Sequence, residues 1–290
     1  MFKGFDSGVA AVNGVNIPYV KGGSGPALLL LHGHPQTKAI WHKVAPILAE
    51  RFTVVASDLR GYGDSSKPEG LADHSNYSKR EMARDQLELM QSLGLPDFHL
   101  IGHDRGGRVA HRLAADHGSA VKTLTLLDIC PTLAMYEQTN MEFASAYWHW
   151  FFLIQPAPFP ETLIEQNPEF YFTKLMGNRS AGLSPFTNEA WAEYMRCNAD
   201  PKTIHGMCED YRAAAGIDLT HDRADREIGR RLRMPLLALW GKNGVIERCF
   251  EPIQEWQRVA IDVRGHALNS GHYIPEEAPE ELLAALNEFI

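Results

Sequence analysis

Along the first 130 residues, short apolar runs alternate with stretches of helical spacing. The runs at 27–31, 53–57, 98–101 and 121–127 are typical of strands buried in a parallel sheet. The segment 78–93 has the spacing of a helix, opens with the capping box Ser78 and Glu81, and stops at Gly94. A shorter helix is expected over 41–49, and a hairpin turning at Asn13-Gly14 over 9–20. This order predicts an α/β fold, with a mostly parallel sheet and helices on both faces.

The pattern changes after residue 130, where strand-like runs give way to aromatic-rich helical spacing, as over 141–153 and 189–197. Apolar strand patterns resume at 235–240 and near 260–263, and a last helix is expected over 275–290. We therefore predict a core domain formed by residues 1–130 and 217–290, with residues 131–216 inserted as a helical cap.

The composition is that of a globular domain. The 290 residues are 44% hydrophobic and 22% charged, with a net charge of −8 and no Lys/Arg cluster of the kind that binds nucleic acid. No apolar run approaches the length of a membrane span, and no secretory signal pattern opens the sequence. The four scattered cysteines include no CxxC pair, and His205 and Cys208 lack further metal ligands nearby, so we expect a cytoplasmic protein without a metal or organic cofactor.

The most informative segment follows the strand pattern at 98–101, where Gly102-His103-Asp104-Arg105-Gly106-Gly107 leads into a helical pattern. Glycines on both sides of a reactive side chain are typical of the nucleophile elbow of α/β hydrolases. Asp104 occupies the tip. A carboxylate that attacks a saturated carbon forms an ester, which an activated water can then hydrolyse. Asp104 therefore predicts displacement at a saturated carbon.

Hydrolysis of an aspartyl ester needs a general base, and His272 follows the last predicted strand, where this fold carries its histidine. Asp128 ends the strand before the cap and is the better candidate to orient it, although a capping role is the alternative; after the strand at 235–240 the first carboxylate is Glu247. The backbone N–H groups of His34 and Arg105 are expected to form the oxyanion hole.

Arg105 and Arg108 share one face of the first helical turn after the elbow. The helix dipole disfavours cations there, so an anionic substrate beside Asp104 would compensate both side chains. The alternative is that they pair with protein carboxylates such as Asp104 or Glu209.

Taken together, the segments 32–37, 102–109, 127–129, 149–150, 155–158, 208–212 and 270–272 resemble the fluoroacetate (haloacetate) dehalogenases over nearly the whole chain. The resemblance implies Asp104 as nucleophile, His272 as base with Asp128, and Arg105 and Arg108 as the substrate carboxylate clamp. It further implies a halide pocket of His149, Trp150 and Tyr211, inversion at carbon, and a homodimer. The sequence departs from the family pattern at His34, where the family has phenylalanine.

Two related enzyme classes and one different class remain as alternatives. Haloalkane dehalogenases and epoxide hydrolases share the aspartate and histidine, but both usually carry tryptophan after the nucleophile, where this chain has Arg105. Hydrolase folds also serve as non-catalytic small-ligand receptors. The expected reaction is conversion of fluoroacetate or chloroacetate to glycolate and halide.

Overall fold

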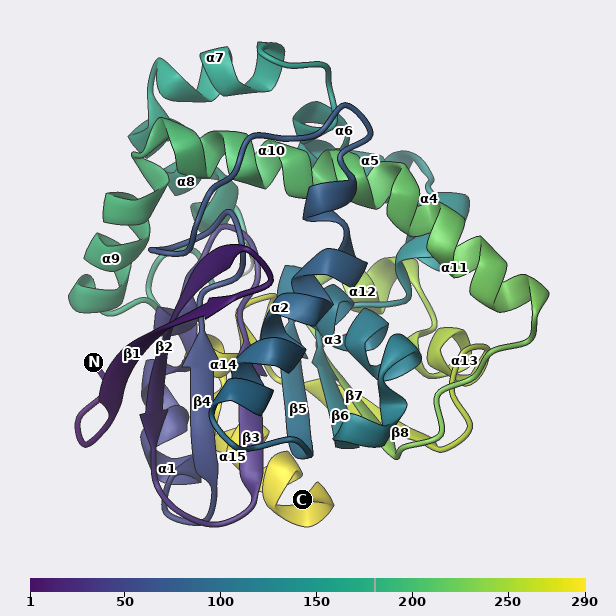
Figure 1. Ribbon diagram of the computed structural model, residues 1–290. Helices are drawn as coiled ribbons and strands as arrows, with labels where there is room; N and C mark the ends of the chain where they lie inside the picture. The colour runs from purple at the N-terminus through teal and green to yellow at the C-terminus, as the bar shows by residue number, and fades with distance from the viewer. Residues whose placement is uncertain (180) are drawn as a thin grey trace.

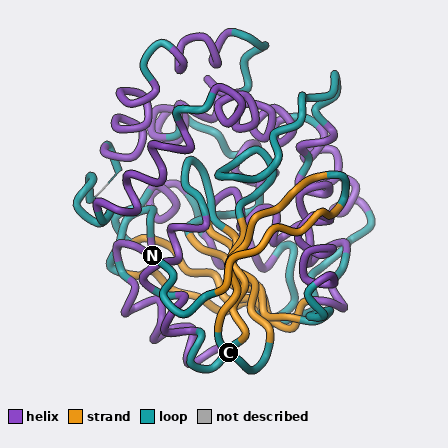
Figure 2. The backbone as a smooth tube through the Cα atoms, turned by 60° about the vertical axis from the view of Figure 1, so that its left-hand side comes forward, coloured by secondary structure: helices purple, strands orange, loops and turns teal. Residues whose placement is uncertain are grey.

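A single eight-stranded sheet organises the computed structural model, which describes residues 1–179 and 181–290 (Figures 1 and 2). The strand order is β1-β2-β4-β3-β5-β6-β7-β8, with β1 and β2 antiparallel to their neighbours and β4 to β8 parallel with β3. This confirms the predicted α/β class. The strands are β1 Asp6–Val12, β2 Val15–Gly22, β3 Ala27–Leu31, β4 Thr53–Ser57, β5 Phe98–His103, β6 Val121–Leu127, β7 Leu236–Gly241 and β8 Val263–Leu268.

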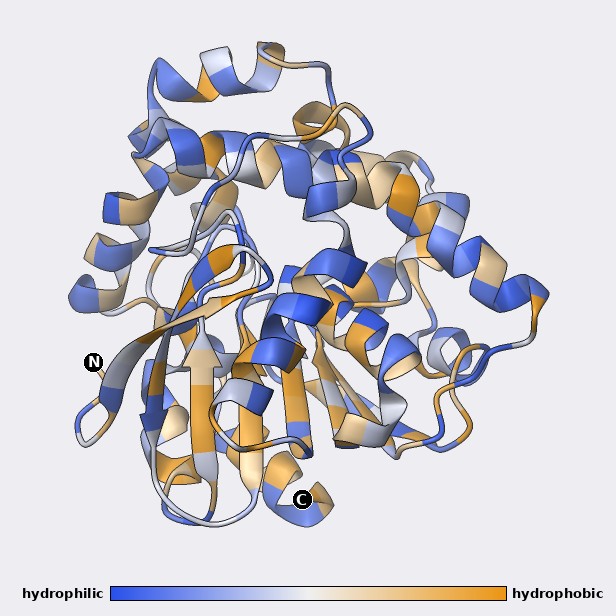
Figure 3. Ribbon diagram, in the orientation of Figure 1, coloured by the Kyte–Doolittle hydropathy of each residue, from blue (hydrophilic) through white to orange (hydrophobic). Residues whose placement is uncertain are grey.

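Both faces of the central strands, β3 to β7, are largely buried, as their continuous apolar runs require. In β3, Leu29 and Leu31 pack into one hydrophobic cluster with residues of α2 and α3, and Leu28 and Leu30 pack into a second with residues of η1, α1 and α15. Figure 3 shows the apolar strands enclosed by helices with hydrophilic outer faces. The helices around the sheet are η1 Lys38–Lys43, α1 Ala45–Leu48, η2 Ser75–Tyr77, α2 Lys79–Ser92, α3 Asp104–Asp116, η3 Gly118–Ala120, α12 Val245–Cys249, α13 Pro252–Gln257, α14 Ile274–Glu277 and α15 Pro279–Phe289.

The chain between β6 and β7 forms a layer of helices above one end of the sheet, crossed by the long helix α10 (Figure 1). This helical layer comprises α4 Thr132–Glu137, α5 Met141–Ala146, α6 Trp148–Leu153, α7 Phe159–Glu165, α8 Pro168–Gly177, α9 Asn188–Asn198, α10 Pro201–Ala215 and α11 Ile217–Glu227. The layer includes the segment expected as a cap, whereas the division into domains at residues 130 and 217 stays a prediction.

The structure corrects four predicted elements. The helix expected over 41–49 is a 3-10 turn followed by α1, which restarts beside Pro46. The last helix divides into α14 and α15 at Ala278–Pro279, and the segment 141–153 divides at Tyr147. The last strand lies at Val263–Leu268 rather than 260–263, because a half-exposed edge strand lacks a continuous apolar run.

Among the described residues, no helix is long and apolar enough to cross a membrane.

Candidate active site

Asp104 occupies the sharp turn between β5 and α3, as the sequence predicts. Its φ of +46° lies in the left-handed region, which ordinary residues rarely adopt. Neighbouring glycines make the turn sterically feasible: a Cβ added to Gly33 would lie 2.5 Å from Cβ of Asp104, and one added to Gly106 would collide with the carbonyls of Leu31 and His32. The turn therefore presents the carboxylate beyond the end of the sheet.

His272 and Asp128 converge on this carboxylate from the ends of two other strands. Nδ1 of His272 lies 2.6 Å from Oδ2 of Asp128, and its Nε2 lies 3.9 Å from Oδ2 of Asp104. Oδ1 of Asp128 accepts the backbone N–H of Gly241 at 3.0 Å, which holds the carboxylate in place. Glu247, the other acid considered from the sequence, instead accepts a hydrogen bond from Nε1 of Trp240.

His103, directly before Asp104, supports the same arrangement. Its Nε2 lies 2.8 Å from the carbonyl oxygen of His272, and the two imidazole centroids are 4.7 Å apart. Burial lowers the pKa of His103 to about 3, so its ring is neutral and Nε2 donates to the carbonyl. This bond holds the main chain that carries the candidate base.

The surroundings of Asp104 favour its ionised form. Burial opposes ionisation, but His272 and the guanidinium groups of Arg108 and Arg105 hold the pKa of Asp104 well below its ordinary value. The backbone N–H of His34 donates to Oδ1 of Asp104 at 2.9 Å. A carboxylate in this setting is a nucleophile at neutral pH, and the N–H of His34 already points at one of its oxygens.

Arg105 is buried and already paired with Asp210 of α10. Its Nε and Nη2 donate to the two carboxylate oxygens of Asp210 at 2.7 and 2.9 Å, and Nη2 also reaches the carbonyl of Asp210. The protein partner is thus Asp210 rather than Asp104 or Glu209. Nη1 has no hydrogen-bond partner among residues 1–179 and 181–290, so it is the part of this side chain that can meet a ligand.

Arg108 contacts only neutral acceptors among the described residues. Its Nη1 donates to Oγ1 of Thr132 at 2.9 Å, and its guanidinium lies 4.7 Å from the ring centre of Trp150. Burial and the proximity of Arg105 lower the pKa of Arg108 from its ordinary value. A buried cation without a carboxylate partner is the arrangement that an anionic ligand would stabilise.

The helical layer places His149, Trp150 and Tyr211 over this site. All three side chains are buried, and their atoms Nδ1, Nε1 and Oη have no hydrogen-bond partner within the described residues. The ring centroids of His149 and Tyr211 are 5.9 Å apart, and those of Trp150 and Tyr211 are 6.4 Å apart. Buried polar atoms are normally paired, so this group is suited to hold a small ligand.

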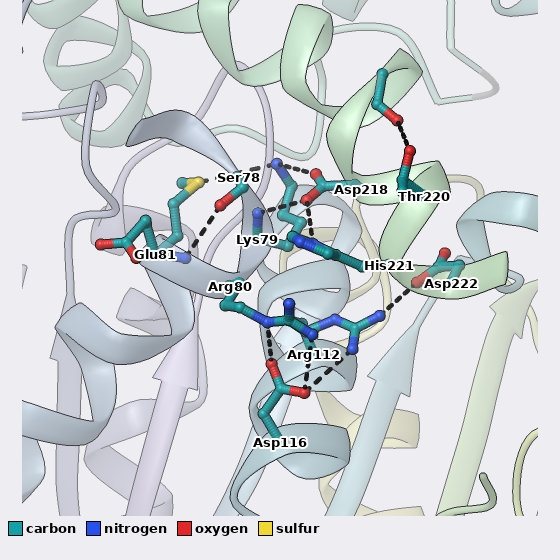
Figure 4. A network of polar contacts seen from close by, with 12 residues as sticks. Ser78, Lys79, Arg80, Glu81, Arg112, Asp116, Asp218, Thr220, His221 and Asp222 are labelled. Atoms are coloured by element: carbon teal, nitrogen blue, oxygen red, sulfur yellow. Dashed lines mark hydrogen bonds and ion pairs between the residues drawn. The ribbon is translucent and has the colours of Figure 1, made fainter. Parts of the chain in front are cut away.

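Sequence reasoning missed Asp210, which fixes Arg105 through an extended polar network. Asp210 also accepts a hydrogen bond from the hydroxyl of Tyr62 at 2.6 Å, and another from Nζ of Lys79. The backbone N–H of Lys79 in turn donates to Asp218 of α11 at 2.8 Å (Figure 4). These contacts join α2 and α3 to the helical layer. The paired residues lie more than 100 positions apart, so no local sequence pattern predicts the pairs.

Arg179 is a second residue that the sequence did not identify. Its guanidinium lies 4.7 Å from the ring centre of Tyr147. Burial opposes the charge, but Tyr147, Tyr273 and, to a smaller extent, Asp104 raise the pKa of Arg179 above its ordinary value. It is therefore a third guanidinium close to the site.

A model of the α/β hydrolase fold matches residues 26–248. The chain belongs to the α/β hydrolase family. It is 47% identical to a fluoroacetate dehalogenase from a Burkholderia species, over 100% of this chain and 95% of that protein. It is 36% identical to a soluble epoxide hydrolase from Corynebacterium sp. (strain C12), over 97% of this chain and 95% of that protein. A crystal structure from Nostoc sp. PCC 7120, assigned to the α/β hydrolases, superposes with a TM-score of 0.97 at 53% identity and covers 100% of this chain and 99% of that one. The resemblance to fluoroacetate dehalogenases is confirmed.

Proposed function

We propose that this α/β hydrolase is a hydrolytic dehalogenase of short 2-haloacids, converting fluoroacetate or chloroacetate to glycolate and halide. One observation carries the proposal: an ionised aspartate lies between buried guanidinium groups and a set of buried donors without protein partners. The guanidinium groups suit a carboxylate, and the donors suit a leaving halide. The 47% identity to a fluoroacetate dehalogenase supports the same substrate class.

In the first step, a carboxylate oxygen of Asp104 attacks the α-carbon from the side opposite the halogen. The C–O bond forms as the carbon–halogen bond breaks, and the bonding pair leaves with the halide. We assign the substrate carboxylate to Arg108 and to Nη1 of Arg105. The halide charge grows among His149, Trp150 and Tyr211, whose neutral donors stabilise it more in the transition state than in the substrate.

In the second step, water hydrolyses the ester on Asp104. His272 removes a proton from the water as the water oxygen attacks the carboxyl carbon of Asp104. Asp128 stabilises the imidazolium that forms on His272. The backbone N–H groups of His34 and Arg105 donate hydrogen bonds that stabilise the negatively charged oxygen of the tetrahedral intermediate. Collapse releases glycolate and restores the Asp104 carboxylate, and the reaction consumes one water and yields halide and one proton.

Halide release from fluoroacetate and chloroacetate tests the proposal, with 1,2-dibromoethane and styrene oxide as neutral comparison substrates. We expect turnover of the two acids and none in Asp104→Asn. A single turnover in ¹⁸O-labelled water should place label in Asp104, because the second step attacks the aspartyl carbon. Turnover of only the neutral compounds would refute the role of the arginines, and label confined to the product would indicate direct attack by water.

Epoxide hydrolysis is the second candidate, because the hydroxyl of Tyr211 lies in the site without a partner among the described residues and a tyrosine can protonate an epoxide oxygen. The 36% identity to an epoxide hydrolase keeps this candidate open. Styrene oxide in the same assay distinguishes the two.

We also propose a homodimer in the cytoplasm. The large apolar side chains of Phe159 and Leu163 on α7 and Phe170 on α8 are exposed, which favours a contact with another protein surface. The cysteines are free, and Cys130, Cys197 and Cys208 are buried, as is common in reducing compartments. Light scattering tests the dimer, and cell fractionation tests the location.

A further inference from the structure

The loop after β3 carries two buried histidines with different surroundings. In His32, Nδ1 lies 3.0 Å from the carbonyl of Gly33, and Nε2 accepts the backbone N–H of Leu59 at 3.0 Å. Both nitrogens of that ring therefore serve the fold. In His34, neither Nδ1 nor Nε2 has a hydrogen-bond partner among residues 1–179 and 181–290, although the side chain is buried. Unpaired buried polar atoms are costly, so a ligand is the natural partner of this ring.

The His34 ring lies against the rings already assigned to the halide. Its centroid is 5.1 Å from that of Tyr211, with the planes near perpendicular, and 6.1 Å from that of His149, with the planes nearly parallel. Since His149 and Tyr211 are 5.9 Å apart, the three centroids form a nearly equilateral triangle. The backbone N–H of His34 is bonded to Asp104, so the ring is also held at a fixed place relative to the nucleophile.

The charge state of the ring suits a donor to a small anion. Burial lowers the pKa of His34 to about 3, so the imidazole is neutral near pH 7 and carries one N–H. Since neither nitrogen is engaged by the described residues, both tautomers leave that N–H available to a ligand.

We infer that the side chain of His34 is a fourth donor to the departing halide, beside His149, Trp150 and Tyr211, and that it favours fluoride over chloride. This inference rests on the proposed function. Fluoride is the smaller ion and concentrates its charge, so its departure depends more strongly on each hydrogen bond than the departure of chloride does. His34 is thus a residue that sets leaving-group specificity.

The test compares kcat/KM for fluoroacetate and chloroacetate in the wild type, His34→Phe and His34→Gln. Phenylalanine keeps an aromatic ring but removes the N–H, whereas glutamine keeps a donor. We expect His34→Phe to lower the fluoroacetate to chloroacetate ratio by about 10-fold or more, and His34→Gln to restore part of it. The ratio is independent of the amount of folded enzyme, so a partly unfolded variant still gives an answer.

Phe172→Leu is the matched packing control, because the Phe172 ring lies 6.5 Å from that of His34 and carries no donor. Its ratio should stay within about twofold of the wild type, as a packing change alone affects both acids. An unchanged ratio in His34→Phe, or an equal change in Phe172→Leu, overturns the inference while leaving the proposed function intact. A wild type that releases neither halide overturns the proposed function and this inference with it.

Discussion

The side chains of Asp128, His272 and Asp104 form a chain of contacts, in which each contact orients the next side chain. The N–H of Gly241 holds Asp128, Asp128 fixes the Nδ1 side of His272, and Nε2 of His272 is thereby directed toward Asp104. In the proposed mechanism, attack on carbon involves only Asp104 among these three side chains, whereas ester hydrolysis involves all three. The two chemical steps should therefore respond differently to substitution.

Asp128→Asn should slow the second step selectively, because an amide neither orients nor stabilises the imidazolium as a carboxylate does. We expect a rapid release of about one halide per active site, followed by turnover reduced on the order of 10³-fold. Quenched-flow halide assays measure both phases. Glu247→Gln is the control, since that carboxylate contacts Trp240 instead and should leave both phases unchanged. Loss of the rapid phase in Asp128→Asn would contradict the assignment.

Glu276 gives a second prediction at this scale, concerning stability rather than catalysis. It accepts hydrogen bonds from Gln36 at 2.6 Å and Tyr194 at 3.2 Å, and burial raises its pKa from 4.5 to about 8. Between these values the folded state retains a proton that the unfolded state releases. The free energy of unfolding should therefore fall as pH rises from 4.5 to 8, by at most about 1.4 kcal/mol per pH unit from this group.

Urea denaturation across this pH range measures the effect, with Glu276→Gln as the comparison. The difference in free energy of unfolding between the variant and the wild type should change in favour of the variant as pH rises, because the amide has no proton to lose. A difference that is constant with pH would show that Glu276 is ionised in the folded protein.

At the scale of elements, the sequence predicts the parallel strands and the helix after the elbow, because continuous apolar runs and the glycine pattern are local signals. It places Asp104 and Asp128 at strand ends for the same reason, whereas His272 is predicted only from its position in the chain after the last expected strand. The sequence does not predict features that depend on tertiary contacts. The hydrophobic pattern of the edge strand β8 alternates only weakly, and the ion pair of Arg105 with Asp210 joins α3 to α10 across 105 positions. Arg179 follows α8 with no motif around it.

The pair between Arg105 and Asp210 should be among the strongest links between α3 and the helical layer. Asp210→Asn leaves the cations of Arg105 and Lys79 buried without their common carboxylate, so we expect a loss of about 3–5 kcal/mol in the free energy of unfolding. Asp64→Asn removes an exposed partner of Arg196 and should lose less than about 1 kcal/mol. Urea denaturation of both variants checks the contrast, and equal losses would contradict it.

At the scale of the whole molecule, the helical layer and the sheet share one hydrophobic cluster. Phe143, Trp150 and Tyr211 of the layer belong to the same buried cluster as Leu29 of β3 and Val109 of α3. A smaller cluster around Phe186 and Tyr194 of the layer likewise includes Ala39 and Tyr273 beside the sheet. Exposing the buried apolar side chains of either part to water would therefore also open the hydrophobic core of the other.

We therefore expect the layer and the sheet domain to unfold together. The six tryptophans report on both parts: Trp148, Trp150 and Trp191 lie between β6 and β7, and Trp41, Trp240 and Trp256 lie in the rest of the chain. Denaturation followed by fluorescence should have the same midpoint as far-UV circular dichroism, as a single cooperative transition requires. In Trp191→Phe and Trp256→Phe, which remove one reporter from each part, the two signals should again coincide. The contrary result would be a fluorescence midpoint at lower denaturant than the circular dichroism midpoint, with a smaller gap in Trp191→Phe. It would mean that the layer opens first, and that the site loses its proposed halide donors while the sheet remains folded.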